Sequence, residues 1–134
     1  MVLVDTSVWV DYFNGVRSTQ TDQLDALLGT GTILTGDLIL AELLQGFARD
    51  SDFRRARSLL LQLPYADLAG KEVALEAARL YRSLRTKGVT VRKTVDMFIG
   101  TFCVLTGHEL LHADRDFDVL EKHCGLRVVR AVPD

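Results

Sequence analysis

The chain has little of what marks secreted, membrane-spanning or fibrous proteins. Only two of its 134 residues are proline and ten are glycine, which excludes a collagen-like or linker-rich chain. Its two cysteines, Cys103 and Cys124, have no CxxC spacing, so we expect both to stay reduced without a disulfide. The longest uncharged runs, 26–36 and 97–107, fall far short of the roughly 20 residues that span a bilayer. Because Asp5 interrupts the apolar start, unlike in a secretory signal, we expect a cytoplasmic protein with no membrane segment.

Net charge is also small. Sixteen Lys and Arg against 18 Asp and Glu leave a formal charge of −2, so the overall balance does not point to a polyanionic partner. The hydrophobic fraction of 48% excludes a disordered chain. Together with the length, it predicts a single domain over residues 1–134.

Short apolar runs alternate with longer stretches of helical period, a pattern typical of an α/β domain with a mainly parallel sheet. Pro64 restricts the third expected strand to a sheet edge, and Asp37, Ser51 and Thr94 are expected helix N-caps. The expected strands are 2–4, 32–35, 63–68, 109–112 and 127–130. The expected helices are 7–13, 21–28, 38–47, 52–62, 71–86, 95–106 and 117–122.

Two acidic residues stand near the first two expected strands. Asp5 directly follows strand 2–4, at the carboxyl end where open parallel sheets bind their ligands, although an N-cap role would explain it alone. Glu42 lies inside the apolar segment 38–44. A buried carboxylate without a partner is costly, so Glu42 implies a partner or a cation.

Two further acidic positions repeat this pattern. Asp96 is the one charged residue in segment 94–105, although an acidic side chain also suits a first helical turn. Asp114 follows strand 109–112 and is trailed by Asp116, where a polar turn is the alternative explanation. Carboxylates that converge at one sheet end need compensation, and oxygen ligands suit Mg²⁺ or Mn²⁺. Such a site performs metal-assisted phosphodiester hydrolysis.

Four segments of the chain resemble, in sequence and in order, the motifs of the PIN domain family. The length of the chain and the order of these segments resemble those of the VapC toxins within that family. The segments are Val-Leu-Val-Asp5-Thr6-Ser7, Ala41-Glu42-Leu43, Asp96 with Met-Phe-Ile-Gly, and Leu110-Leu111-His112-Ala113-Asp114-Arg115-Asp116-Phe117. The resemblance implies a three-layer α/β/α sandwich. It also implies an endoribonuclease that uses Mg²⁺ or Mn²⁺ and cuts structured RNA such as tRNA or rRNA. Its implied partners are a VapB-type antitoxin, which inhibits it, and a second copy in a homodimer.

The resemblance also assigns roles residue by residue. Asp5, Glu42, Asp96 and Asp114 match the family's acidic quartet, and Asp116 is a carboxylate that can join or replace the fourth. We expect Asp5, Asp96 and Asp114 to bind the cation, with Glu42 orienting or deprotonating water. Thr6 and Ser7 match the polar pair that supports the first Asp.

A basic stretch precedes Asp96. Segment 79–93 carries six basic residues and no acidic one, so it holds +6 while the rest of the chain holds −8. A solvated helix face explains it as well as RNA phosphate contacts do when it is taken alone, but its place beside the quartet favours RNA. The residues expected to bind RNA are Arg79, Arg82, Arg85, Arg92 and Lys93.

The first helix is apolar on more than one face. Trp9 and Phe13 lie four residues apart, and such aromatic pairs are mostly core. Val8 and Tyr12 form a second apolar pair at the same spacing, and one buried face does not require both pairs. Trp9 and Phe13 are therefore also candidates for binding a partner.

Three other interpretations compete. A haloacid-dehalogenase-like phosphatase needs a second Asp where Ser7 stands, which disfavours it. A zinc site from Cys103, His108, His112 and Cys124 matches no compact zinc spacing. A non-catalytic PIN-like scaffold that binds RNA or protein would have lost an acidic position, and none is lost.

Overall fold

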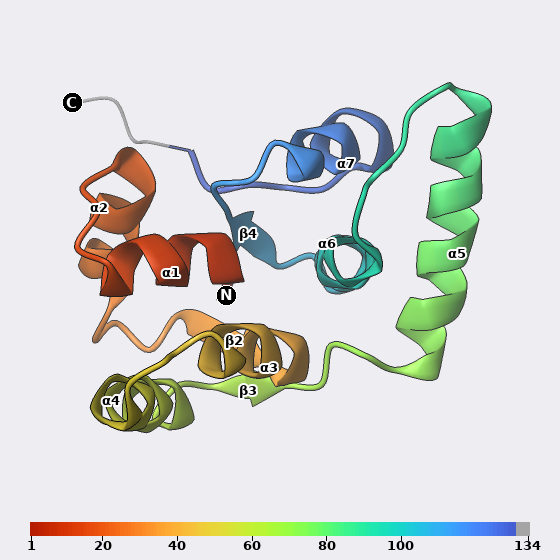
Figure 1. Ribbon diagram of the computed structural model, residues 1–134. Helices are drawn as coiled ribbons and strands as arrows, with labels where there is room; N and C mark the ends of the chain where they lie inside the picture. The colour runs from red at the N-terminus through yellow and green to blue at the C-terminus, as the bar shows by residue number, and fades with distance from the viewer. Residues whose placement is uncertain (131–134) are drawn as a thin grey trace.

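The computed structural model describes residues 1–130, which form a four-stranded parallel sheet flanked by seven helices (Figure 1). The spatial order of the strands is β3-β2-β1-β4. The strands are β1 (Val2–Val4), β2 (Ile33–Gly36), β3 (Tyr65–Ala66) and β4 (Glu109–Leu111). The helices are α1 (Thr6–Phe13), α2 (Thr19–Leu27), α3 (Asp37–Gln45), α4 (Asp50–Leu61), α5 (Lys71–Thr86), α6 (Thr94–Thr106) and α7 (Asp116–Cys124).

The helices cover both faces of the sheet, which confirms the expected α/β/α architecture. Right-handed crossovers are expected between parallel strands, and with the strand order β3-β2-β1-β4 they put α1 to α4 on one face and, on the return from β3 to β4, α5 and α6 on the other. The helix contacts agree, because α1 packs on α2 and α3, whereas α6 packs on α5 and α7. In Figure 1, α1 and α2 lie to the left of the sheet and α5 and α6 to its right.

The edges of the sheet differ from the sequence expectation in detail. The expected strand 63–68 is an edge strand, as predicted, but only β3 pairs with β2. The expected strand 127–130 is wrong, because this segment forms a single parallel bridge between Leu110 and Val128. Val128 and Val129 are partly buried, whereas Arg127 and Arg130 on either side of them are exposed. Two apolar residues between two charged ones are too few to extend the strand pairing.

Three helices begin one or two residues earlier than the sequence predicts. The N-caps of α3, α4 and α6 are Gly36, Arg49 and Lys93, so the expected caps lie inside the first turns. Asp37 has another task, since its carboxylate accepts the Leu68 N–H at 2.6 Å and ties α3 to the chain after β3.

The core lies on both faces of the short strands. Leu3, Val4, Leu110 and Leu111 are buried in the sheet, and Trp9 of α1 and Phe117 of α7 are among the largest fully buried side chains. No helix within residues 1–130 has both the length and the hydropathy to cross a membrane.

Gly36 packs closely against the chain in and after β3. A Cβ at this position would lie 2.4 Å from Leu68 Cγ and 2.6 Å from the Ala66 carbonyl oxygen. Gly36 ends β2 and caps α3, so this contact fixes where α3 leaves the sheet.

Candidate active site

Asp5 stands where β1 ends and α1 begins. Its backbone N–H donates to the Leu111 carbonyl at 2.9 Å, and its Oδ2 accepts the Ser7 N–H at 3.0 Å as the N-cap of α1. Within residues 1–130, Asp5 Oδ1 is buried without a hydrogen-bond partner. The capping role is therefore real, and it leaves one carboxylate oxygen unused.

Ser7 connects Asp5 to the loop after β4. Its hydroxyl donates to Asp5 Oδ2 at 2.6 Å and accepts the Ala113 N–H at 3.0 Å. One side chain thus fixes both the first carboxylate and the backbone next to Asp114. Thr6 contacts Glu42 instead, because its hydroxyl donates to Glu42 Oε1 at 3.0 Å.

Asp96 lies in the first turn of α6 and is 4% exposed. Its Oδ2 is buried and finds no hydrogen-bond partner in the part of the chain that the structure describes. Burial, reinforced by the negative charges of Asp5 and Asp114, raises the pKa of Asp96 to about 7.

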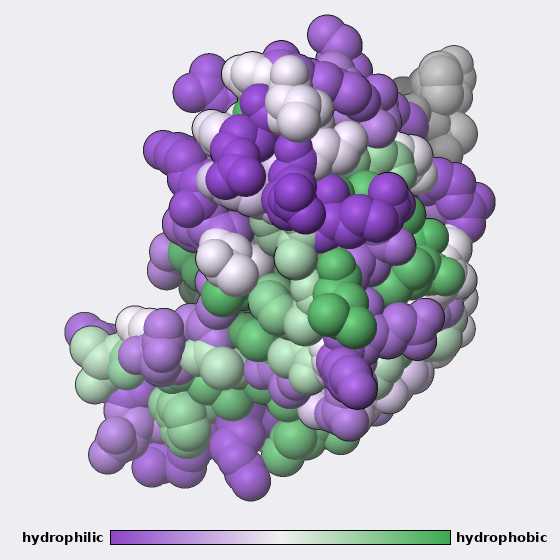
Figure 2. Space-filling view, turned by 90° about the vertical axis from the view of Figure 1, so that its right-hand side faces the viewer, coloured by the Kyte–Doolittle hydropathy of each residue, from purple (hydrophilic) through white to green (hydrophobic). Residues whose placement is uncertain are grey.

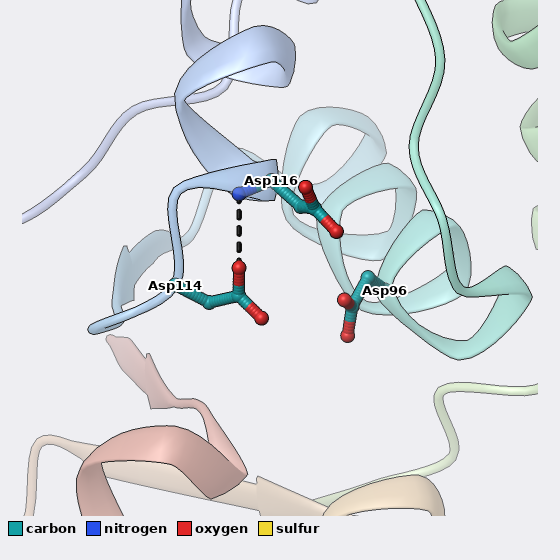
Figure 3. Close-up of side chains that lie close together, drawn as sticks. All are labelled: Asp96, Asp114 and Asp116. Atoms are coloured by element: carbon teal, nitrogen blue, oxygen red, sulfur yellow. Dashed lines mark hydrogen bonds between the residues drawn. The ribbon is translucent and has the colours of Figure 1, made fainter.

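Asp114 and Asp116 complete a triad with Asp96. One ligand atom from each of the three lies within 4.8 Å of the other two, and this is the one such group of three or more His, Cys, Asp or Glu among the described residues. Figure 3 shows the three carboxylates around a common space, with the Asp116 N–H donating to Asp114 Oδ1 at 2.9 Å. Asp116 also pairs with Arg92, whose Nε lies 3.3 Å from Asp116 Oδ2.

The predicted quartet meets in one pocket of about 350 Å³. Asp5, Glu42, Asp96 and Asp114 all line it, so four segments far apart in the sequence deliver carboxylates to one place. Asp11 also lines this pocket and was missed from the sequence. Its position one helical turn after Ser7 is the signal that could have found it.

Burial raises the pKa of Asp5 and of Glu42 above their usual values, against hydrogen bonds from Ser7 and Thr6 that act to lower them. The charge of Asp5 raises the pKa of Glu42 further, and Lys93, which also lines the pocket, acts to lower it. Carboxylates that resist ionisation together, with two buried oxygens unpartnered within residues 1–130, fit a hard divalent cation bound by oxygen ligands.

Without a divalent cation, the protein should lose stability as the pH rises from about 4 to about 7. Over this interval the unfolded chain has released the Asp96 proton while the folded state retains it, so the free energy of unfolding falls with rising pH. For one such group the slope approaches about 1.4 kcal/mol per pH unit. Urea unfolding in EDTA from pH 4 to 8 measures it. An identical slope in Asp96→Asn would contradict this origin.

The PIN domain family model matches residues 2–123 of this chain. This chain belongs to the PIN domain family. Two curated relatives are VapC ribonuclease Mb1587 of Mycobacterium bovis and Ribonuclease VapC11 of Mycobacterium tuberculosis. Each is 31% identical over 129 residues, which covers 95% of this chain and 96% of the relative.

Solved structures share the fold of this PIN domain. VapBC2 from Rickettsia felis, bound to a DNA fragment from its promoter, matches with a TM-score of 0.73 at 18% identity and covers 96% of this chain and 98% of its own. A toxin-antitoxin complex from Klebsiella pneumoniae matches with a TM-score of 0.71 at 19% identity, with both chains fully covered.

The basic residues of the PIN domain do not form one uniform stripe. Arg79 pairs with Glu76 one turn earlier on α5, whereas Arg82 and Arg92 line a common pocket between α5 and α6. Lys93 lines the acidic pocket instead. Arg92 and Lys93 are neighbours in sequence, so the basic segment 79–93 lines both the pocket between α5 and α6 and the acidic pocket.

The two aromatic candidates of α1 separate. Trp9 is fully buried, so its expected contact with a partner is wrong: the helices packed against α1 cover it. Phe13 is partly buried and lines a surface pocket of about 540 Å³ with Tyr12 and residues of α4. Of these two residues, only Phe13 has an exposed part that a partner could contact.

Proposed function

We propose that this PIN domain is the toxin of a toxin–antitoxin pair: an endoribonuclease that needs Mg²⁺ or Mn²⁺ and cuts structured RNA such as tRNA or rRNA. The observation that carries the proposal is the single pocket shared by Asp5, Glu42, Asp96 and Asp114, with buried carboxylate oxygens unpartnered within residues 1–130. The ribonuclease relatives support the same reaction class.

The chain's own residues divide the work. Asp5, Asp96 and Asp114 would hold the cation, and Asp116 stands within reach as a further ligand. When bound, the cation neutralises phosphate charge and makes water more acidic. Glu42 is half-buried, and its raised pKa suits it to orient water and accept its proton. Thr6 holds the Glu42 carboxylate toward the pocket.

The proposed partner is a VapB-type antitoxin that inhibits the enzyme in the cytoplasm, within a complex that contains a toxin homodimer. The pocket lined by Tyr12, Phe13 and Leu59 offers an aromatic and apolar surface for an antitoxin segment. Val10, 40% exposed on the same helix, lines with Phe13 and Phe47 another pocket of about 120 Å³ that could take part of the same segment. Structures of toxin–antitoxin complexes with this fold support the assignment.

The direct test is cleavage of total RNA by the purified protein, with the new ends mapped. We expect cleavage with Mg²⁺ or Mn²⁺, none in EDTA, and none by Asp5→Ala. Equal cleavage by the wild type and Asp5→Ala would remove the nuclease proposal. Specific RNA binding without any cleavage would favour the non-catalytic scaffold.

Glu42→Gln separates chemistry from partner binding. This substitution should abolish cleavage while the affinity for the antitoxin stays unchanged, which pull-down or calorimetry measures. Full activity in Glu42→Gln would overturn the role of Glu42.

Ser7→Ala should lower activity or metal affinity by about 10- to 100-fold, the usual effect of removing a side chain that orients a metal ligand. The reduction follows because Ser7 positions both Asp5 and the backbone at Ala113. Mg²⁺ titration of the cleavage rate measures the effect. Ser51→Ala, an exposed serine of α4, is the matched control, and equal behaviour of the two variants would contradict the prediction.

Reversing Arg82 and Arg85 to Glu should weaken RNA binding and flatten its dependence on salt, with a slope reduced by about 1 for each phosphate that is no longer neutralised. Fluorescence anisotropy against salt concentration measures both quantities. The control reverses Arg54 and Arg57, two exposed arginines of α4, and changes the net charge equally. If both double variants weaken binding alike, the effect is one of overall charge and the assignment of Arg82 and Arg85 fails.

A further inference from the structure

A second pocket lies between α5 and α6, outside the acidic site. Its volume is about 330 Å³, near the lower end of the roughly 300–1,000 Å³ range of small-ligand pockets. Helix α5 contributes Ala74, Ala77, Ala78, Tyr81 and Arg82, and the segment from Val91 into α6 contributes Val91, Arg92, Thr94, Met97 and Phe98.

Small side chains create this hollow. Three alanines of α5 face Met97 and Phe98 of α6, so the two helices leave space that larger residues would fill. Tyr81 and Phe98 supply aromatic surface, and both are partly exposed. The walls therefore suit a flat apolar group with a polar edge.

Arg92 joins this pocket to the acidic site. It lines the pocket, and its Nε lies 3.3 Å from Asp116 Oδ2 of the triad. The Arg92 side chain is 78% exposed, and its neighbour Lys93 lines the acidic pocket. A ligand that spans both pockets would pass over these two residues.

The charge of this face indicates what covers it. None of the described residues that line the pocket is acidic, and Arg82 and Arg92 stand in its wall. Figure 2, which faces the α5 side, shows apolar residues gathered between hydrophilic ones on this face. A second copy of the chain that used this face would place both sets of these arginines in one interface, and an acidic peptide would meet the adjacent carboxylates. RNA presents a phosphate to the acidic site and a base to the pocket.

We propose that the pocket between α5 and α6 takes one unstacked base of the RNA, next to the phosphate that is cut. This rests on the proposed function, because it places the RNA backbone at the acidic site. Bases stack on aromatic rings and on guanidinium planes, which Tyr81, Phe98, Arg82 and Arg92 provide here. The pocket then selects unpaired RNA and sets which phosphate reaches the carboxylates.

The test uses a short synthetic RNA that spans the mapped cut, with one abasic residue placed in turn at each flanking position. In the wild type, one abasic position should lower kcat/KM by about tenfold or more, the effect of removing one stacked base. Ala78→Phe fills the pocket from an exposed position of α5. In Ala78→Phe, the intact RNA should be cut as slowly as the wild type cuts that abasic RNA, and the abasic residue should have no further effect.

Leu75→Phe is the matched control, because Leu75 is 65% exposed on α5 and does not line the pocket. Its abasic profile should equal that of the wild type. Tyr81→Leu is a second variant that removes an aromatic wall without filling the space, and circular dichroism checks that each variant folds.

A flat abasic profile in the wild type would overturn the proposal. So would Ala78→Phe if it weakens antitoxin binding or changes the oligomeric state and leaves RNA cleavage unaltered, because the pocket then takes a peptide or a second copy. Anisotropy with the same RNAs in EDTA separates the two proposals. If the wild type binds RNA but cuts none, the nuclease proposal fails, and the abasic binding profile of a short RNA that it binds then decides whether the pocket takes a base.

Discussion

Asp96→Asn should reduce RNA cleavage by a factor of about 100 or more and, at pH 7.5, make the metal-free protein more stable than the wild type. Activity falls because a carboxylate ligand of the proposed cation is removed. Stability rises because an amide carries no charge, whereas the Asp96 carboxylate ionises in a buried site among Asp5 and Asp114. A substitution that stabilises a protein and inactivates it marks a position kept for function.

Single-turnover cleavage and urea unfolding in EDTA measure the two effects. Added Mg²⁺ should stabilise the wild type by about 2.7 kcal/mol at one hundred times its dissociation constant, and should stabilise Asp96→Asn much less. Asp25→Asn, an exposed change on α2, should alter neither quantity. A variant Asp96→Asn that is less stable than the wild type at pH 7.5 would show that Asp96 has a structural role instead.

Gly36→Ala should lower the free energy of unfolding by about 3 kcal/mol, at the upper end of the usual cost of overpacking. The added Cβ would collide with the Ala66 carbonyl oxygen, which belongs to the backbone of β3, as well as with the buried Leu68 side chain. Backbone cannot rotate away as a side chain can. The strain falls at the start of α3, so it should also displace Glu42 and slow cleavage.

Gly70→Ala is the control for Gly36→Ala. Gly70 also caps a helix, and no atom of the described residues lies within 4 Å of a Cβ placed there. Its free energy of unfolding should stay within about 0.5 kcal/mol of the wild type, as is usual for surface changes. Equal destabilisation by the two substitutions would contradict the packing explanation and indicate a general intolerance of alanine at helix caps.

The convergence of the four carboxylates could be predicted from the sequence, whereas the edges of the sheet could not. Strands β1 and β4 are short and, except for Glu109, apolar, and residues that follow parallel strands share one sheet end. Topology alone could therefore bring Asp5 and Asp114 together. Glu42 and Asp96 could be found because each interrupts an apolar segment.

Side-chain direction could not be predicted in the same way. Asp114 and Asp116 are separated by one residue, so the sequence does not show which of them points toward Asp96. In the structure the Asp116 N–H donates to Asp114 Oδ1, and both carboxylates lie near Asp96. Trp9 and Phe13 share one helical stripe, yet tertiary packing buries the first and leaves the second partly exposed. Burial at this level depends on neighbouring helices, which periodicity does not specify.

The link from Ser7 to Ala113 has a consequence for synthesis of the chain. It bridges residues 106 apart in sequence, and β1 pairs in register with β4 over a similar separation. Long-range parallel pairing closes late in folding, because both partners must first exist. A nascent chain on the ribosome therefore carries Asp5, Glu42 and Asp96 without a completed pocket. The acidic pocket is complete only after translation has passed Asp116, so a shorter nascent chain lacks part of the ligand set of the proposed cation.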